Sequence, residues 1–195
     1  MTSHSAGRVR GRAAPSALLR LAAALVLLLV GADGACAEIG SASEAAVKMA
    51  FVYNFGKFVE WPPPALATSQ PFVLCTAGDT EQFKSSLAAI EGKTAQGHEV
   101  KVHALDGNAE LAGCQTLFIA QSEREHVREL LKAARNLPIL TVSDIDEFAD
   151  AGGVVELITR NGRVQFNINV RAAKAANLTI SSELMKLAHS VVGAE

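Results

Sequence analysis

The sequence predicts an α/β fold: a three-layer, mostly parallel mixed sheet flanked by helices, with a C-terminal antiparallel hairpin. Short continuous apolar runs alternate with helical segments along the chain, which is the pattern of parallel strands buried between two layers of helices. Caps and turn residues separate these segments. Late in the chain the pattern changes to two strands joined by Asn161-Gly162, a dipeptide typical of tight hairpins.

The first predicted helix begins at the capping box Ser41-Ala42-Ser43-Glu44 and ends near Val59. The three prolines at 62–64 prevent its continuation. The elements expected next are a buried strand at 71–78, a helix at 79–90 opened by Asp79, a strand nearer an edge at 98–105, a buried strand at 114–120, a helix from the capping box at 122–125 to about Arg135, and a buried strand at 138–143.

The last third of the chain contains a short expected helix from Asp144 to the pair Gly152-Gly153, and then the hairpin at 154–170. The second hairpin strand alternates, so one face is apolar and the other is polar. The apolar residues are Val164, Phe166, Ile168 and Val170, and the polar ones are Gln165, Asn167 and Asn169. Two helical segments, 171–176 and 181–192, follow, the second capped by Ser181.

The first 37 residues have the organisation of a secretory signal peptide, which would precede a single α/β domain at 38–195. Arginines form a basic leader, residues 21–30 form a short apolar run, and Ala35-Cys36-Ala37 supplies the small residues that a signal peptidase reads. The apolar run is too short for a membrane span, which needs roughly 20 residues. Asp33, three residues before Cys36, argues against a lipid-attachment site. We therefore expect cleavage after Ala37 and export.

Charge and motifs exclude several classes of function. The whole chain has a formal net charge of −2, and removal of residues 1–37 leaves 14 basic and 19 acidic residues, which argues against binding of nucleic acid or anionic lipid. No nucleotide-binding, nucleophile-elbow, zinc-protease or C-x-x-C motif occurs. The acidic residues at 144–150 depart from the calcium-loop pattern, because Ala149 and Val155 occupy its glycine and glutamate positions. The sequence predicts no catalytic residues, no metal site and no cofactor.

Two cysteines, Cys75 and Cys114, remain after the predicted cleavage. In an oxidising compartment an even pair indicates a disulfide, and closing a loop of about 40 residues would stabilise the fold by roughly 4 kcal/mol. The first and third strands of such a sheet often lie side by side, which would bring the two cysteines within bonding range. The alternative is two buried free thiols in apolar strands.

Residues 47–62, VKMAFVYNFGKFVEWP, concentrate aromatic side chains and include the single tyrosine and the single tryptophan. On a helix, Phe51, Phe55 and Phe58 form an apolar stripe beside a second one, so the helix should be buried on more than one side. Two interpretations stay open: a core helix with a solvated strip, or an aromatic surface that forms a pocket or interface. The candidate interface or pocket residues are Tyr53, Asn54, Lys57, Phe58 and Trp61, with Asn167 and Asn169 of the hairpin, which could also simply face water.

This stretch resembles the signature of the YfiR family, a K-x-x-x-x-Y-N-F-x-K-F-x-x-W-P run soon after a signal peptide. The C-terminal part agrees as well, with ILTVSD at 139–144, GG at 152–153 and VQFNINVRAAKAANLTISSELMKLA at 164–188. The resemblance covers residues 43–193, essentially all of the chain after the predicted cleavage site.

The resemblance implies a small periplasmic α/β regulator and not an enzyme. The family's best-known type represses an inner-membrane diguanylate cyclase by binding its periplasmic part, and an outer-membrane lipoprotein relieves the repression by sequestering the repressor. The output is the cyclic-di-GMP level, hence biofilm formation and motility. Cys75 and Cys114 resemble one cysteine pair of that type, whereas a second pair has no counterpart because no cysteine follows Cys114. A homodimer is compatible with the resemblance.

The leading hypothesis is therefore a periplasmic protein that represses a membrane-bound signalling enzyme, a diguanylate cyclase or another membrane sensor, by protein contact. The alternative is a periplasmic small-molecule-binding sensor, with its cleft at the carboxyl edge of the sheet near Gly78-Asp79 and Ser143-Asp144. An unrecognised hydrolase is disfavoured because no nucleophile and base can be paired.

Overall fold

The structure is a computed structural model that describes residues 39–106 and 111–193, with side chains from residue 44 onward. Residues Gly40–Glu195 form one compact unit, and its first helix begins one residue earlier, at Ile39. The predicted signal peptide, residues 1–37, lies outside the described residues.

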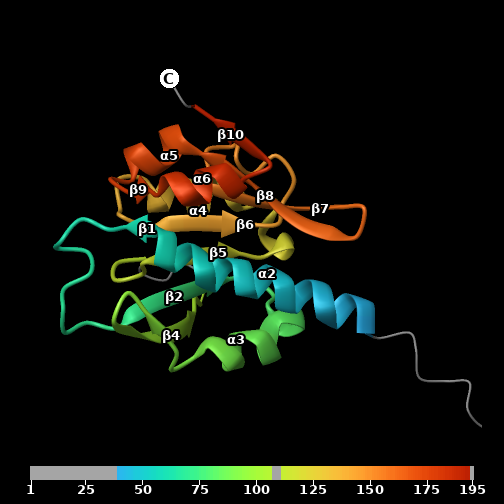
Figure 1. Cartoon of the computed structure of the whole chain (residues 1–195), viewed down its shortest axis with the longest axis horizontal. Helices are drawn as coiled ribbons and strands as arrows, with labels where there is room; N and C mark the ends of the chain where they lie inside the picture. The colour runs from blue at the N-terminus through green and yellow to red at the C-terminus, as the bar shows by residue number, and fades with distance from the viewer. Residues whose placement is uncertain (1–38, 107–110, 194–195) are drawn as a thin grey trace, which may run out of the picture. The chain divides into compact units, whose positions relative to one another are not determined.

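An eight-stranded mixed sheet forms the centre of the fold, in the order β10-β8-β7-β6-β5-β2-β4-β3 (Figure 1). Five of its strand pairs are parallel, and β3–β4 and β7–β8 are antiparallel. The strands are β2 (Phe72–Ala77), β3 (Thr94–Ala95), β4 (His98–Ala104), β5 (Thr116–Ile119), β6 (Leu140–Ser143), β7 (Val155–Arg160), β8 (Arg163–Asn169) and β10 (Ser190–Val192). This arrangement confirms the predicted mixed, mostly parallel α/β sheet.

The helices pack on the sheet, and α2 runs across one of its faces (Figure 1). The helices are α2 (Ile39–Phe58), α3 (Lys84–Ile90), α4 (Val127–Ala134), α5 (Val170–Ala175) and α6 (Ser182–Leu187), with 3-10 turns η1 (Glu81–Phe83) and η2 (Gln121–Glu123). A separate two-stranded antiparallel sheet joins β1 (Val59–Glu60), directly after α2, to β9 (Thr179–Ile180).

Alternate residues of the strands enter two core clusters. The α2-side cluster combines α2, α3, α5 and α6 with one set of strand residues, among them Leu74, Phe118 and Phe166. The α4-side cluster combines α4 with the other set, among them Cys75 and Leu117. Strand residues that alternate between two apolar layers explain why the sequence shows continuous apolar runs.

The hairpin and the last helix cap follow the prediction. Asn161 and Gly162 both have positive φ, 51° and 71°, as a two-residue turn between strands of this twist requires. Ser181 caps α6, because its hydroxyl accepts a hydrogen bond from the backbone N–H of Leu184 at 3.2 Å. Asn169 caps α5 in the same way and accepts from Ala172 at 2.9 Å.

The expected helix from Asp144 to Gly152-Gly153 is wrong, and the segment forms a series of turns. Glu147 has a φ of 62°, which interrupts a helix. The buried carboxylate of Glu156 accepts hydrogen bonds from the backbone N–H groups of Glu147 and Ala149, at 3.2 and 3.3 Å, so a partner from β7 takes donors of this segment.

The capping box expected at 122–125 is also wrong. The Ser122 hydroxyl accepts from the backbone N–H of Asp79 at 2.8 Å, on a neighbouring segment, and η2 precedes a helix that begins only at Val127. The helix expected at 79–90 likewise starts as the 3-10 turn η1 before α3. The Ser122 hydroxyl therefore accepts its hydrogen bond from the loop after β2 and does not cap the helix, which explains why the expected capping box is absent.

The helix expected at 181–192 ends at Leu187, and residues 190–192 form β10. Ala188 adopts an extended conformation, and the N–H of His189 donates to the carbonyl of Phe166 at 2.8 Å. Strand β10 then pairs in parallel with β8. Strand β10, and not the antiparallel hairpin of β7 and β8, therefore forms this edge of the sheet.

Candidate functional site

The aromatic stretch divides between core and surface. Phe55 is 1% exposed, and its ring lies 5.0 Å from that of Phe166, edge to face. Phe51 is partly buried and contacts both rings, with centroids 5.8 Å from Phe55 and 5.5 Å from Phe166. Phe58 is also partly buried against this cluster. On α2, therefore, Phe55 belongs to the core, whereas Phe51 and Phe58 keep part of their surface accessible. That this surface forms an interface stays a prediction.

An apolar groove lies where these neighbours face β8 and α6. Its volume is about 620 Å³. We call it the α2–α6 groove, and it is lined by Phe51, Asn54, Phe55 and Phe58 of α2, Val164, Gln165 and Phe166 of β8, Leu184 and Leu187 of α6, and Ala188 and His189. Leu187 is 70% exposed, the most exposed large apolar side chain among the described residues. Such a surface is more typical of an interaction site than of a solvated face.

Of the predicted site residues, the groove brings together only Asn54 and Phe58. Tyr53 and Lys57 lie elsewhere on α2: the Tyr53 hydroxyl donates to the carbonyl of Thr94 at 2.8 Å, and the Lys57 ammonium lies 4.2 Å from the centre of the Tyr53 ring. The Lys93 ammonium lies 5.6 Å from the same ring. The contacts of Tyr53 with Thr94 and Lys93 fasten the β3–β4 hairpin to α2.

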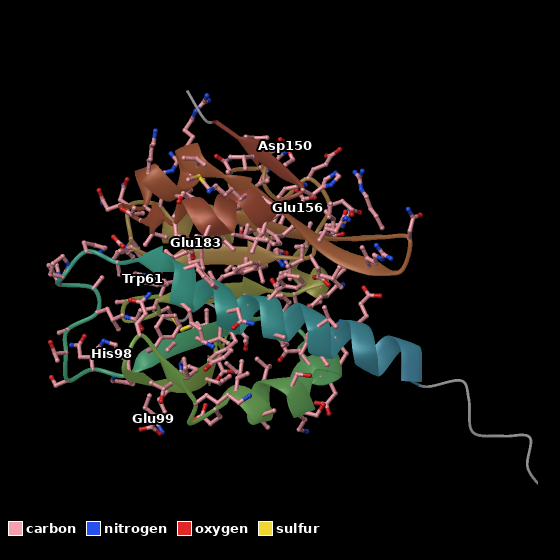
Figure 2. All side chains as sticks on the ribbon, in the orientation of Figure 1. Trp61, His98, Glu99, Asp150, Glu156 and Glu183 are labelled. Atoms are coloured by element: carbon pink, nitrogen blue, oxygen red, sulfur yellow. A yellow bond between two sulfur atoms is a disulfide. The ribbon has the colours of Figure 1, made fainter. Side chains whose placement is uncertain are left out.

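Trp61, labelled in Figure 2, follows β1 and is almost completely buried. Its indole N–H donates to the carbonyl of Gln115 at 3.2 Å, and its ring meets Phe72 edge to face at 5.2 Å. The Gln115 side chain in turn accepts from the N–H of Val73 and donates to the carbonyl of Ala65. In this structure Trp61 closes the end of the sheet where β2 and β5 begin.

The two asparagines of the hairpin lie outside the groove. Besides capping α5, Asn169 donates from its amide to the carbonyl of Ala149 at 2.8 Å, so it holds the 144–152 turns against α5. Asn167 is partly buried, and its side-chain oxygen has no hydrogen-bond partner among the described residues. A role of either residue in binding a partner stays a prediction.

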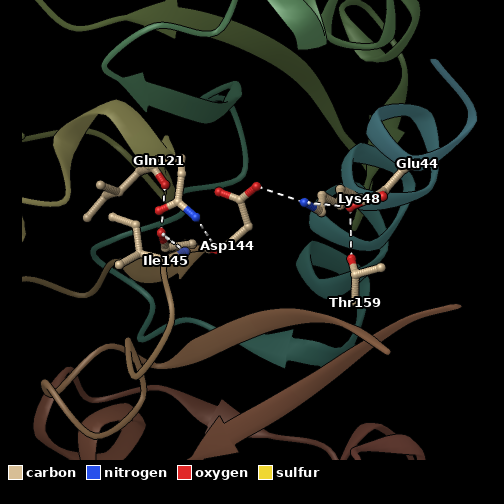
Figure 3. A network of polar contacts seen from close by, with 8 residues as sticks. Glu44, Lys48, Gln121, Asp144, Ile145 and Thr159 are labelled. Carbon is tan, nitrogen blue, oxygen red and sulfur yellow. Dashed lines mark hydrogen bonds and ion pairs between the residues drawn. The ribbon is translucent and has the colours of Figure 1, made fainter. Parts of the chain in front are cut away.

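A charged network at the other end of α2 was not expected from the sequence (Figure 3). The Lys48 ammonium lies 2.9 Å from the Glu44 carboxylate and 2.8 Å from that of Asp144, whose side chain is only 7% exposed. Thr159 of β7 donates to Glu44 at 2.8 Å. The network joins two stretches of the YfiR-like pattern, because Lys48 opens the first and Asp144 ends ILTVSD.

The network shifts the pKa values of Lys48 and Glu44. Burial alone would lower the pKa of Lys48, but the hydrogen bonds with Asp144 and Glu44 outweigh it and raise that pKa above its ordinary value. The hydrogen bond from Lys48, and then that from Thr159, lower the pKa of the Glu44 carboxyl. Part of the network could have been predicted from the sequence, because Lys48 interrupts an apolar stripe and a buried lysine needs an acidic partner.

The carboxyl edge of the sheet, suggested for a small-molecule cleft, differs between its two parts. Near Gly78 the turn η2 fills the space, since a Cβ there would lie 2.5 Å from the Ser122 hydroxyl. Beside Asp144 there is a polar pocket of about 400 Å³, lined mainly by charged residues that include Glu44, Lys48 and Glu156. Within residues 39–106 and 111–193, no cluster of three or more His, Cys, Asp or Glu side chains could hold a metal ion.

Cys75 and Cys114 form the predicted disulfide, with 5.7 Å between their Cα atoms. The bond joins β2 to the residue two positions before β5, and these strands pair in parallel as expected for the first and third strands. The prediction of a disulfide is therefore confirmed.

The fold and the groove define an α/β protein with a mixed, mostly parallel sheet and an open apolar surface between α2, β8 and α6. More narrowly, the chain belongs to the YfiR/HmsC-like family, whose model matches residues 45–189. This match confirms the resemblance drawn from the two sequence motifs.

Two solved structures show weaker similarity. The ABC domain in complex with L-Trp from Streptococcus pneumonia is 10% identical, with 76% of this chain and 60% of that chain covered and a TM-score of 0.49. A conserved domain protein from Vibrio cholerae O1 biovar El Tor is 12% identical, with 61% and 54% covered and a TM-score of 0.45. The chain thus spans less than two thirds of either protein, and we base no argument on these similarities. No curated protein matches the chain.

None of the helices in the described part of the chain combines the length and the apolar character that a membrane crossing requires.

Proposed function

We propose that this protein is an exported regulator without catalytic activity of its own, which represses a membrane-bound diguanylate cyclase by binding the periplasmic part of that enzyme. The observation that carries the proposal is membership of the YfiR/HmsC-like family over residues 45–189. Residues 1–37 would be removed as a signal peptide, leaving residues 38–195 as a single periplasmic domain. The Cys75–Cys114 disulfide supports an oxidising compartment.

The α2–α6 groove is the surface that we assign to this contact. Protein interfaces depend on a few aromatic or aliphatic anchors that become desolvated on binding. Leu187 and Phe58 offer such anchors from two different elements, and Phe51 and Phe166 line the same groove. Asn54 is exposed at the same site and supplies a polar group at the rim.

The test is binding of residues 38–195 to the purified periplasmic domain of a candidate cyclase, together with cyclase activity in membranes. Leu187→Asp should weaken binding and repression at least about tenfold, because it places a charge in a desolvated apolar contact. Val47→Asp is the matched control, since Val47 is 40% exposed on α2 but does not line the groove. Absence of binding by the unmodified protein under both oxidising and reducing conditions would refute the proposal.

The family resemblance adds two further partners to the proposal. An outer-membrane lipoprotein would sequester the regulator and so release the cyclase, and a homodimer would be the form that is sequestered or bound. Sedimentation of residues 38–195, alone and with the candidate lipoprotein, measures both associations. A monomer at all concentrations would remove the homodimer from the proposal without affecting the cyclase contact.

A further inference from the structure

A second cavity lies between α4 and α5, away from the residues of the α2–α6 groove. Its volume is about 380 Å³, within the range of small-molecule sites. Ile139, Val154 and Ala176 are buried residues of its wall, and Arg135 and Arg171 stand at its rim. We call this cavity the α4–α5 pocket.

Residues of both core clusters line the pocket. Ile139 belongs to the α4-side cluster, whereas Val154 and Ala176 belong to the α2-side cluster. Thr141, Val154 and Asn169 lie side by side at its base, on β6, just before β7 and at the end of β8. A cavity between two separately packed clusters is part of the fold and needs no rearrangement to form.

Hydrogen bonds fix the base and one wall of the pocket. The N–H of Val154 donates to the Thr141 hydroxyl at 3.0 Å, and the N–H of Asn169 donates to the carbonyl of Val154 at 2.8 Å. The Asn169 side chain bridges α5 and the carbonyl of Ala149. A ligand would therefore meet a preorganised surface, which lowers the entropic cost of binding.

The charge of the pocket is positive on a chain whose formal net charge is −2. Arg135 follows α4 and Arg171 lies in the first turn of α5, so two helices each bring one guanidinium to the rim. Neither arginine forms an ion pair within the described residues, and no carboxylate lines the pocket. Guanidinium groups recognise carboxylate and phosphate oxygens through paired hydrogen bonds.

We propose that the α4–α5 pocket binds a small amphipathic anion. Arg135 and Arg171 hold the carboxylate or phosphate of the ligand, and its apolar body packs on Ile139, Val154 and Ala176. A purely polar anion would leave the apolar wall in contact with water, and a neutral apolar molecule would leave both guanidinium groups without a partner. This inference stands apart from the proposed contact with a cyclase, since the two sites share no residue.

Octanoate and octanol are suitable probes, because they share an apolar chain and differ in charge. Octanoate, kept below its micelle-forming concentration, should shift the backbone amide signals of Arg135, Gly152 and Arg171 saturably in residues 38–195. Octanol should shift them at least tenfold less at the same concentration. Equal shifts with both probes, or shifts centred on Phe58 and Leu187 of the groove, would overturn the proposal.

The double variant Arg135→Gln/Arg171→Gln tests the two guanidinium groups. Both side chains are exposed, so the variant should fold and keep its melting temperature without ligand. Its dissociation constant for octanoate should rise at least tenfold. Lys174→Gln is the matched control, because Lys174 is an exposed cation on the same helix that does not line the pocket. An equal loss in this control would show that general surface charge, and not the pocket, binds the anion.

Octyl phosphate in place of octanoate distinguishes the two anionic groups, and binding of either supports the proposal.

Discussion

The two sides of the sheet are stabilised by different means. The α2-side cluster is the larger of the two among the described residues, and aromatic contacts connect its elements, such as Phe55 with Phe166 and Phe83 with Phe118. The α4-side cluster has one buried ring in the part that the structure describes, that of Phe148. It contains the disulfide between Cys75 and Cys114 instead.

This difference indicates how the smaller, α4-side cluster can be sufficient to stabilise its side of the sheet. Burial of apolar surface stabilises a fold in proportion to the area removed from water, so the smaller cluster gains less from burial. A disulfide acts mainly by restricting the unfolded chain, and the 39-residue separation of its cysteines makes that effect substantial. The cross-link therefore lies on the side of the sheet where packing contributes least.

The largest expected effect breaks the α2-side cluster. Phe55→Ala should lower the free energy of unfolding by about 3–5 kcal/mol, because it leaves a cavity beside Phe166 that the surrounding strands cannot fill. Phe58→Ala should cost only about 1 kcal/mol, because Phe58 is partly buried at the groove and water can occupy the space. Urea unfolding followed by circular dichroism measures both changes, and equal losses would show that Phe58 belongs to the core.

The next largest effect is expected when the disulfide is removed from the α4 side of the sheet. Cys75→Ala/Cys114→Ala should lower the free energy of unfolding by about 2–4 kcal/mol. Reduction of the unmodified protein should produce a similar loss, and thiol titration of the denatured, non-reduced protein should find no free thiol.

Combining the two changes sharpens the comparison. If the clusters are independent, the losses from Phe55→Ala and from the double cysteine variant should add within about 0.5 kcal/mol. A coupling larger than 1 kcal/mol would mean that the sheet transmits packing changes from one face to the other.

Much of the fold could be predicted because it depends on local signals. Buried strands appear as apolar runs, and Asn161-Gly162 specifies its own turn. The cysteine pairing needed one rule that is not local, the usual side-by-side placement of the first and third strands, which brings Cys75 and Cys114 together. The errors occur where a distant group takes over a backbone donor or a strand partner. Glu156 binds the N–H groups of the 144–152 turns, and β8 recruits β10 from a segment with a helical pattern.

The candidate site was predictable only in part for the same reason. The ring-rich helix could be recognised from its sequence, and Asn54 and Phe58 do line the groove. The other wall comes from β8 and α6, whose position beside α2 is a result of tertiary packing. Leu187 carries no local signal that separates it from Leu184, its buried neighbour one turn earlier.

The smallest expected effect concerns the charged network at the start of α2, which links the helix to β7 and to Asp144. Glu44→Gln should lower the free energy of unfolding by about 0.5–1 kcal/mol at pH 6, because the Glu44 side chain is 41% exposed and solvent screens its pairing with Lys48. The pKa of Glu44 is lower in the folded protein than its ordinary value of 4.5. Its contribution is therefore fully present above that value and is lost as the pH falls through the lower folded pKa.

Comparison of urea midpoints at pH 6 and pH 3 tests this sign. The difference between the unmodified protein and Glu44→Gln should shrink at pH 3, whereas Glu60→Gln, at an exposed glutamate just after α2, should show no difference at either pH. Lys48 sets the limit of the network at high pH. Because the pKa of Lys48 is raised in the folded protein, its stabilising contribution is complete below its ordinary pKa of 10.5 and is lost as the pH rises through the folded pKa. If the Glu44→Gln difference is the same at both acidic and neutral pH, the Thr159 hydrogen bond and packing, and not charge, connect α2 to β7.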